Sequence, residues 1–392
     1  MTRQNVRFQL LDALRGLAAL WVFTFHYGFS DASRMALGWG MPLLRQGHLG
    51  VPMFFVLSGY CLMASVRTAV RDGESTASFL GRRFLRIFPP YWFSIAVVAS
   101  VPFIIEGLSA WKTGHYISPS ASGNINLGYL TYTPGAWLRV LTLTQVFASV
   151  PGATNLQYKF TTINAVYWTL AIEFQFYLLM AVALALRSRA LSFIGGVTLA
   201  SAGIWLLGIW GVSGVCLPYW PMFAVGILLF LIIERGWTYR RLDVRGRAWL
   251  PLSILVGVFV AVTIAGHQTS DTSFAIGFGV TLWCLHALDD SYRSRLSSPN
   301  RSGRVFFRTA QYVGLMSYSL YLLHGRVQFL ALQICRQVAS SGLVQDALTM
   351  LTTCLLCYAF YVCFERPFIR SRVAAVAPSA QLRMPAASTV SV

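Results

Sequence analysis

The chain has 392 residues, of which 56% are hydrophobic and only 11% are charged, and its formal net charge is +18. A soluble domain carries about 25% charged residues, so this composition excludes an ordinary soluble protein and indicates a membrane protein with several spans. The arginines cluster in short segments between apolar runs. This distribution argues against a nucleic-acid-binding protein and is typical of loops that set membrane topology.

Apolar runs of membrane-spanning length predict an all-α bundle of about ten transmembrane helices. One membrane domain should cover 7–367, and the Ala-, Pro- and Ser-rich tail 373–392 is expected to be disordered. The expected spans lie at about 8–29, 49–66, 88–106, 165–186, 191–210, 215–234, 249–266, 272–288, 312–334 and 346–364.

The distribution of the 31 lysines and arginines predicts the orientation of these helices. If the N-terminus is cytoplasmic, most of them fall in segments that alternate to the cytoplasmic side, including 67–87 and 235–248. The positive-inside rule then places both termini inside. The seven cysteines lie mostly within apolar runs and have no metal-site spacing with histidines, so we expect no bound metal.

The first span carries Asp12, Arg15 and His26. Each ionisable group at bilayer depth costs roughly 2.5–3.5 kcal/mol, so such groups usually face a protein interior. Arg15 and His26 are eleven residues apart, almost three turns of about 3.6 residues, and should share one helix face. Asp12 lies one turn before Arg15 and can neutralise it. The alternative is a structural ion pair with one hydrogen-bonded histidine.

The second span begins near Pro52 and contains Ser58 and Gly59 at its middle. A small-residue pair in mid-span permits a close approach by either a neighbouring helix or a ligand.

The segment RRFLRIFPPYW places Arg82, Arg83 and Arg86 at the cytoplasmic boundary. On a helix the three guanidinium groups can converge, which suits phosphate recognition. The alternative is that they only set topology and contact anionic lipid headgroups. Pro89-Pro90 is expected to end this helix and to start the next span.

A long segment between 107 and 164 is the exception among short outer loops, and it either receives a substrate or forms a passive lid. Its apolar stretch 137–150 is too short to span comfortably and predicts a re-entrant or interfacial helix.

Glu173 is the only charge in the fourth span. A lone carboxylate there is a functional candidate, and its depth in an inward-running helix is similar to that of His26. The sequence therefore predicts that Glu173 orients the imidazole of His26.

The ninth span places Ser317, Tyr321 and His324 on one polar face, which either serves the site or only holds helices together. Glu365, in the closing FERP, is expected to pair with a loop arginine.

Six segments in this order resemble the membrane-bound acyltransferase family 3, bacterial O-acyltransferases that modify sugars and related acceptors. They are LDALRG followed by His26, FFVLSGY, RRFLRIFPPYW, WTLAIEFQFY, SYSLYLLH and ERP, and they span about 7–367. The resemblance implies that Arg15 and His26 are essential and that acyl-CoA, usually acetyl-CoA, is the donor from the cytoplasm. It also implies an inner (plasma) membrane location, and many members have a polar or acidic residue where this chain has Pro52. We expect no fused hydrolase-like domain.

The residues and the resemblance together predict transfer of an acyl group from acyl-CoA to a carbohydrate or glycolipid hydroxyl. His26 would act as general base with Arg15 and Glu173, and Arg15 would also support the donor whose phosphates bind Arg82, Arg83 and Arg86. No permanently bound cofactor and no nucleic-acid partner are expected. The alternative is a transporter or acyl relay that hands the group to a partner. The remaining predicted site residues, which support this interior, are Asp12, Ser58, Gly59, Tyr321 and His324.

We predict that single cysteines introduced into 235–248 react with a membrane-impermeant thiol reagent only from the cytoplasmic side. The unmodified chain, with its seven native cysteines, supplies the background. Labelling of these positions from the outside would overturn the orientation.

Overall fold

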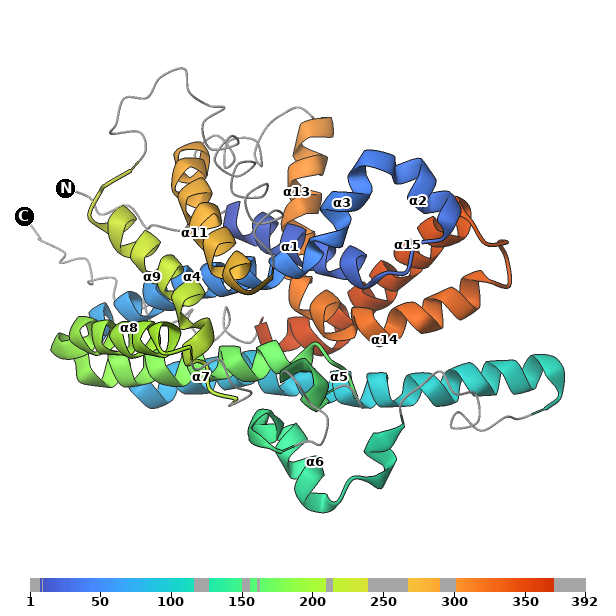
Figure 1. Cartoon of the computed structure of the whole chain (residues 1–392), viewed down its shortest axis with the longest axis horizontal. Coiled ribbons are helices and arrows are strands. Elements are labelled where there is room, and N and C mark those ends of the chain that lie inside the picture. The colour runs from blue at the N-terminus through green and yellow to red at the C-terminus, as the bar shows by residue number, and fades with distance from the viewer. Residues whose placement is uncertain are drawn as a thin grey trace, which may run out of the picture.

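The computed structural model describes Phe8 and residues 10–115, 127–149, 156–160, 163–208, 214–238, 267–289 and 301–369. Within these ranges every regular element is a helix and there is no strand (Figure 1), which confirms the expected all-α class. The predicted span 249–266 and the predicted disordered tail 373–392 lie outside the described residues.

Every predicted span other than 249–266 coincides with a helix. The long helices are α1 (Leu10–His26), α4 (Gly50–Arg71), α5 (Thr76–Thr113), α7 (Tyr167–Leu186), α8 (Ala190–Leu206), α9 (Trp220–Glu234), α11 (His267–Leu285), α13 (Arg301–Leu315), α14 (Ser317–Cys335) and α15 (Leu343–Phe360). Shorter helices are α2 (Asp31–Leu37), α3 (Met41–Arg45) and α6 (Pro134–Leu141), and a π turn, Tyr361–Glu365, follows α15.

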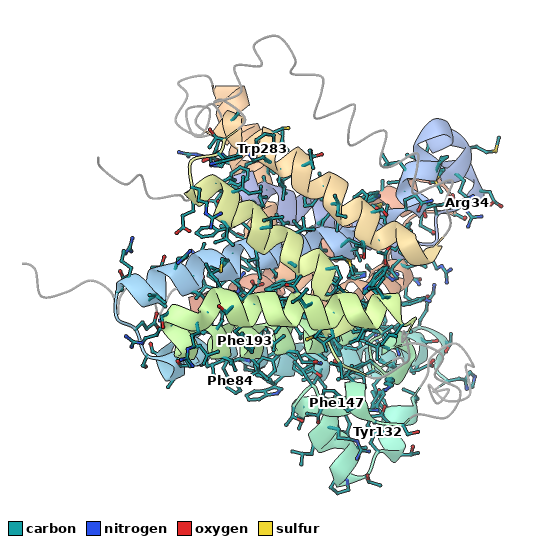
Figure 2. The ribbon with its side chains drawn as sticks, turned by 60° about the vertical axis from the view of Figure 1, so that its left-hand side comes forward. Arg34, Phe84, Tyr132, Phe147, Phe193 and Trp283 are labelled. Atoms are coloured by element: carbon teal, nitrogen blue, oxygen red, sulfur yellow. The ribbon has the colours of Figure 1, made fainter. Side chains whose placement is uncertain are left out.

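Five helical segments of the described residues are long and apolar enough to cross a membrane. They are Gly47–Arg71, Thr76–Thr113, Tyr167–Leu206, Leu217–Glu234 and Leu343–Ile369. Large apolar side chains such as Phe84 of α5 lie on the outside of the bundle (Figure 2), where lipid replaces water. These are the features of a multi-pass membrane protein; the count of ten spans and the orientation stay predictions.

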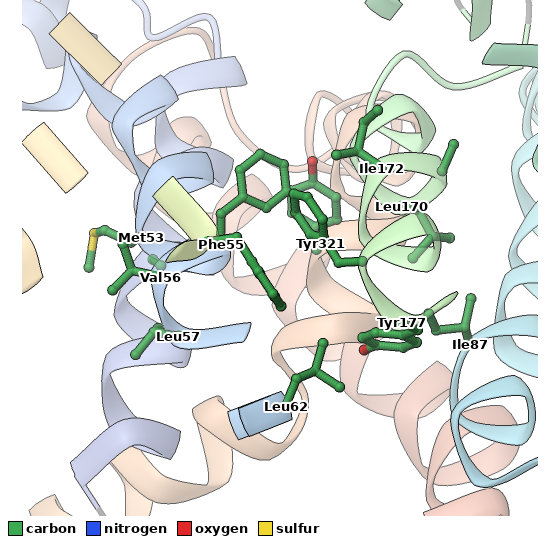
Figure 3. Packing of buried hydrophobic residues seen from close by; sticks show 14 of the residues in the cluster. Met53, Phe55, Val56, Leu57, Leu62, Ile87, Leu170, Ile172, Tyr177 and Tyr321 are labelled. Atoms are coloured by element: carbon green, nitrogen blue, oxygen red, sulfur yellow. The ribbon is translucent and has the colours of Figure 1, made fainter. Parts of the chain in front are cut away.

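The bundle is organised around α4 and α14. Helix α4 packs against α1, α7, α9 and α11, whereas α14 packs against α1, α5 and α15 (Figure 1). Buried side chains of α4, α7 and α14, among them Phe55, Tyr177 and Tyr321, fill the space between these helices (Figure 3).

Two helix crossings depend on glycine. A Cβ atom at Gly226 of α9 would lie 1.9 Å from the Val56 carbonyl oxygen of α4, and one at Gly59 would lie 2.1 Å from the Phe223 carbonyl oxygen. Similarly, a Cβ at Gly314 of α13 would lie 1.8 Å from the Asp12 carbonyl oxygen of α1. Small residues let membrane helices approach closely. The open question at Gly59 is thereby answered, since a neighbouring helix occupies the space in front of it.

The expected helix break at Pro89-Pro90 is wrong, because α5 continues through both prolines and through Pro102. Prolines remove backbone donors, but in membrane helices the neighbouring helices and side chains compensate for the loss. Close to this point the Tyr318 hydroxyl of α14 donates to the Ile87 carbonyl oxygen at 3.0 Å.

Part of the apolar stretch 137–150 forms a short helix, and its re-entrant or interfacial position stays a prediction. Helix α6 has eight residues and begins at Pro134, after the N-cap Thr133, whose side chain accepts from the Ala136 amide. It lies along α5, where the Tyr91 hydroxyl donates to the Val140 carbonyl oxygen at 2.7 Å and the Trp92 indole donates to that of Leu141 at 3.0 Å.

We predict that Gly226→Ala lowers the thermal denaturation temperature of the detergent-solubilised protein, because the new methyl group collides with the backbone of α4. Gly195→Ala, in α8, is the matched control, since no atom lies within 4 Å of its Cβ position. An isolated Gly→Ala change inside a helix normally stabilises by about 0.4–1 kcal/mol. Equal or higher stability of Gly226→Ala would contradict the close packing.

Candidate active site

His26 is the last residue of α1, and its imidazole contacts a second histidine that is fully buried. The distance from His26 Nδ1 to His324 Nε2 is 3.3 Å, and that from His26 Nδ1 to the Val22 carbonyl oxygen is 2.9 Å. His324 Nδ1 in turn lies 3.2 and 3.0 Å from the carbonyl oxygens of Leu320 and Tyr321.

These contacts assign the tautomers of both rings. A carbonyl oxygen only accepts, so His324 carries its proton on Nδ1 and its Nε2 is an acceptor. His26 therefore carries its proton on Nδ1 as well, shared between the Val22 carbonyl oxygen and His324 Nε2. The lone pair of neutral His26 is left on Nε2, the arrangement that a general base requires.

The chain on either side of this pair is anchored. Gln328 of α14 donates from Nε2 to the His26 carbonyl oxygen at 3.0 Å. Asp346 of α15 is buried and accepts from the Tyr27 hydroxyl at 2.8 Å, from the Ser30 amide at 2.9 Å and from the Ser30 hydroxyl at 2.7 Å. Sequence reasoning missed both anchors, although a carboxylate at the start of the last span was a usable signal.

His26 lines a cavity of about 220 Å³ at the C-terminal end of α1 and the N-terminal ends of α4, α7, α9 and α11. Its polar and aromatic lining includes His26, His48, Trp168, Tyr219, Asp271 and Tyr321.

A second, smaller cavity of about 40 Å³ lies against the middle of α4 and α7. Its polar lining consists of Arg15, Ser58, Thr169, Glu173, Ser317, Tyr318 and Tyr321. Glu173 Oε1 accepts from the Ser58 hydroxyl at 2.8 Å and from the Tyr177 hydroxyl at 2.7 Å. Ser58, the small residue that precedes Gly59, thus forms a hydrogen bond with Glu173.

The structure does not pair Glu173 with His26, which corrects the sequence-based assignment. His324 contacts His26, while Glu173 faces the cavity that contains Arg15. Similar depth along two helices says nothing about the direction in which each side chain points, and Glu173 points toward α4.

The two cavities share three lining residues, Val51, Phe55 and Tyr321. Phe55 and Tyr321 are labelled in Figure 3, and the Tyr321 ring contacts the neighbouring Phe54 at 5.6 Å between ring centres. The Tyr321 hydroxyl lies 2.6 Å from the Thr169 hydroxyl of α7. Arg15 therefore lines one cavity and His26 lines the other, and the layer of Val51, Phe55 and Tyr321 separates the two.

The arginines Arg82, Arg83 and Arg86 do not converge. Arg82 forms an ion pair with Glu74. Arg83 is buried, contacts the Ser65 hydroxyl, and lies 5.5 Å from the ring centres of Phe79 and Tyr177. A helix turns successive side chains by about 100°, so only Arg83 and Arg86 point into the bundle. Arg86 lies within electrostatic range of Glu173 and Glu365.

Two expected ion pairs are not found among the described residues. No ion pair joins Asp12 to Arg15 there, and the backbone carbonyl of Asp12 packs against Gly314. Glu365 forms no ion pair with a described loop arginine; it accepts from the amide of Ser319 at 3.1 Å and from its hydroxyl. The π turn directs Glu365 inward, within electrostatic range of Arg86 and Arg15.

Comparison with known proteins gives one family match over nearly the whole chain. The model of a family described as "Acyltransferase domain" matches residues 8–364. No solved structure matches the chain.

Curated relatives match over shorter segments. Similarity is found to "Acyltransferase MdmB" of Streptomyces mycarofaciens, with 29% identity over 185 residues, 45% of this chain and 39% of that protein. "Peptidoglycan O-acetyltransferase OatA" of Listeria monocytogenes is 34% identical over 90 residues, 22% of this chain and 12% of that protein. "Protein 2 in picA locus" of Rhizobium radiobacter is 33% identical over 99 residues, 24% of this chain and 45% of that protein. The chain thus matches less than half the length of each.

We predict that Asp346→Ala loosens the segment that follows His26. The change removes the acceptor of three hydrogen bonds from Tyr27 and Ser30. One hydrogen bond to a charged group contributes about 1.5–3 kcal/mol, so amide exchange over residues 27–33 should accelerate at least about tenfold. Asp31→Ala, an exposed carboxylate in the same segment, is the control. Unchanged exchange in the Asp346 variant would refute the anchoring role.

Proposed function

The chain belongs to the membrane-bound acyltransferase family 3, and from this premise we propose that it transfers an acyl group, acetyl in particular, from acyl-CoA to a hydroxyl of a carbohydrate. The acceptor is a cell-surface or exported glycan, and the enzyme lies in the plasma membrane, where cytoplasmic acyl-CoA can reach it.

One observation carries this proposal: His26 presents an acceptor nitrogen to a cavity that shares a wall with the cavity of Arg15. His26 lies on one side of this wall and the positive charge of Arg15 on the other. This arrangement suits an acceptor that binds beside His26 and an acyl-CoA that approaches from the side of Arg15. A transport path alone would not need a histidine whose tautomer is fixed by a buried partner.

The proposed transfer proceeds as follows. His26 Nε2 takes the proton of the acceptor hydroxyl while the oxygen attacks the thioester carbonyl carbon. The carbon–sulfur bond then breaks, the ester is formed, and the CoA thiolate receives the proton from His26. General base catalysis of this kind contributes typically about 10²–10⁴-fold to the rate. His324 keeps the Nδ1 proton of His26 in place during both proton transfers.

Positive charge marks the proposed donor side. Coenzyme A carries several phosphates, and the arginines Arg82, Arg83 and Arg86 lie at the predicted cytoplasmic boundary. Because Arg83 and Arg86 point inward and Arg82 pairs with Glu74, we assign the phosphates to this positively charged part of α5 rather than to one site shared by all three arginines. Arg15 lies further along the same route and supports the arm that carries the thioester.

We predict that His26→Ala lowers label transfer from acetyl-CoA to membrane glycan by at least about 10²-fold, because the base is lost. The variant should insert normally, since the change adds no buried charge. His115→Ala, an exposed histidine after α5, is the matched control. A well-expressed His26→Ala protein that transfers label at the wild-type rate would end the proposal and favour an acyl relay.

A second variant separates the base from its partner. His324→Phe retains His26 but removes one of the two acceptors of its Nδ1 proton and leaves only the Val22 carbonyl oxygen, so the proton is held less firmly on Nδ1. Transfer should fall less than in His26→Ala, with the loss in kcat and with the acetyl-CoA KM unchanged. A loss confined to the acetyl-CoA KM would contradict the tautomer assignment.

A further inference from the structure

The wall of the His26 cavity carries four side chains that the transfer chemistry does not use. Trp168 and Tyr219 are aromatic, while His48 and Asp271 are polar. They come from four separate elements: Trp168 from α7, Tyr219 from the turn before α9, His48 from the turn before α4, and Asp271 from α11.

The two aromatic residues form a shelf. Their ring centres lie 5.3 Å apart at an interplanar angle of 49°, and Tyr219 also contacts Phe55 edge-on at 6.0 Å. Both side chains are partly buried and both face the cavity. Each ring offers an apolar face to the cavity, and Phe55 supports the ring of Tyr219.

The two polar residues face each other beside this shelf. His48 Nε2 lies 4.0 Å from Asp271 Oδ1, and the side chains are 27% and 43% exposed. The Phe25 ring lies 5.6 Å from the His48 ring and 5.0 Å from the His26 ring, which places the polar pair one aromatic side chain away from the base.

We propose that this cavity is the acceptor subsite and binds one sugar ring. Trp168 and Tyr219 pack against the apolar C–H face of the ring, and Asp271 and His48 hydrogen-bond its hydroxyls, so that one further hydroxyl points to His26 Nε2. This assignment rests on the proposed function and specifies where its acceptor binds.

Three properties of the cavity select a sugar. A pyranose combines an apolar face with a rim of hydroxyls, and this cavity combines an aromatic shelf with a charged acceptor. A phosphate is disfavoured beside the carboxylate of Asp271, so the donor headgroup does not compete for the site. The volume of about 220 Å³ lies below the range of about 300–1,000 Å³ for drug-sized ligands, which suits a single residue of a glycan.

The test measures transfer of labelled acetyl from acetyl-CoA to envelope fragments of cells that lack the gene, with donor and fragments varied separately. Asp271→Asn should lower kcat/KM for the fragments roughly tenfold, about the loss of one hydrogen bond to a charged group. Trp168→Ala should also lower kcat/KM, because it removes the aromatic face that packs on the sugar. In both variants the acetyl-CoA KM should change less than twofold. Trp168→Phe keeps an aromatic ring and should recover part of the loss. Rates are normalised to folded, monodisperse protein.

The control variants make the same two kinds of change, at a carboxylate and at an indole, at positions outside the cavity. Asp31→Asn changes an exposed carboxylate of α2, and Trp111→Ala an indole near the end of α5 that is 88% exposed. Both should match the wild type.

Several outcomes overturn the subsite. They are wild-type transfer by the Asp271 and Trp168 variants, a parallel rise in the acetyl-CoA KM, or Asp271-dependent label on protein or lipid rather than on sugar fragments. If the wild type transfers label and His26→Ala does not, any of these three outcomes refutes the acceptor subsite alone and leaves the proposed function intact. If the wild type transfers none, the proposed function itself fails.

Discussion

The contact between His324 and His26 is the interaction on which the rest of the site depends. Backbone carbonyls of α14 fix the proton of His324, and His324 together with the Val22 carbonyl oxygen fixes that of His26, so the lone pair of His26 is left on Nε2. This chain of constraints works only if the C-terminal end of α1 is held against α14. Gln328 and Asp346 hold it there through the His26 carbonyl oxygen and the segment that follows. The base is thus positioned by backbone geometry rather than by a neighbouring charge.

The charged side chains deeper in the bundle serve a different purpose. Arg15, Arg83 and Arg86 lie among Glu173 and Glu365, so each buried charge has opposite charges within range. Burying such groups in a low-dielectric interior is expensive, and opposite charges with hydrogen bonds from Ser58, Tyr177 and Ser319 offset part of that cost. The arrangement keeps positive charge along the inner half of the bundle, where a polyanionic donor enters in the proposed function.

Sequence reasoning was reliable where one helix decides the outcome and failed where two helices must be related. Apolar runs located the described helices, and Arg15 and His26, for which the eleven-residue spacing predicted a shared face, each line a cavity. Glu173 was assigned to the wrong partner because depth along a helix does not give the direction of a side chain. His324 was expected on a polar face, but its pairing with His26 depends on how α14 crosses α1. The helix break at Pro89-Pro90 was wrong because neighbouring helices support the continuous α5.

The layer of Val51, Phe55 and Tyr321 between the two cavities limits how donor and acceptor can meet. The glycine-mediated crossing of α4 and α9 leaves little freedom for α4 to move, because backbone atoms already touch there. Any opening of this layer therefore depends on its side chains. The Tyr321 hydroxyl is held by the Thr169 hydroxyl at 2.6 Å and by a longer contact of 3.3 Å to the Val166 carbonyl oxygen. Side-chain rotation is far faster than helix movement. In the proposed function, donor and acceptor therefore meet through a rearrangement of side chains in this layer rather than through an alternating movement of two halves.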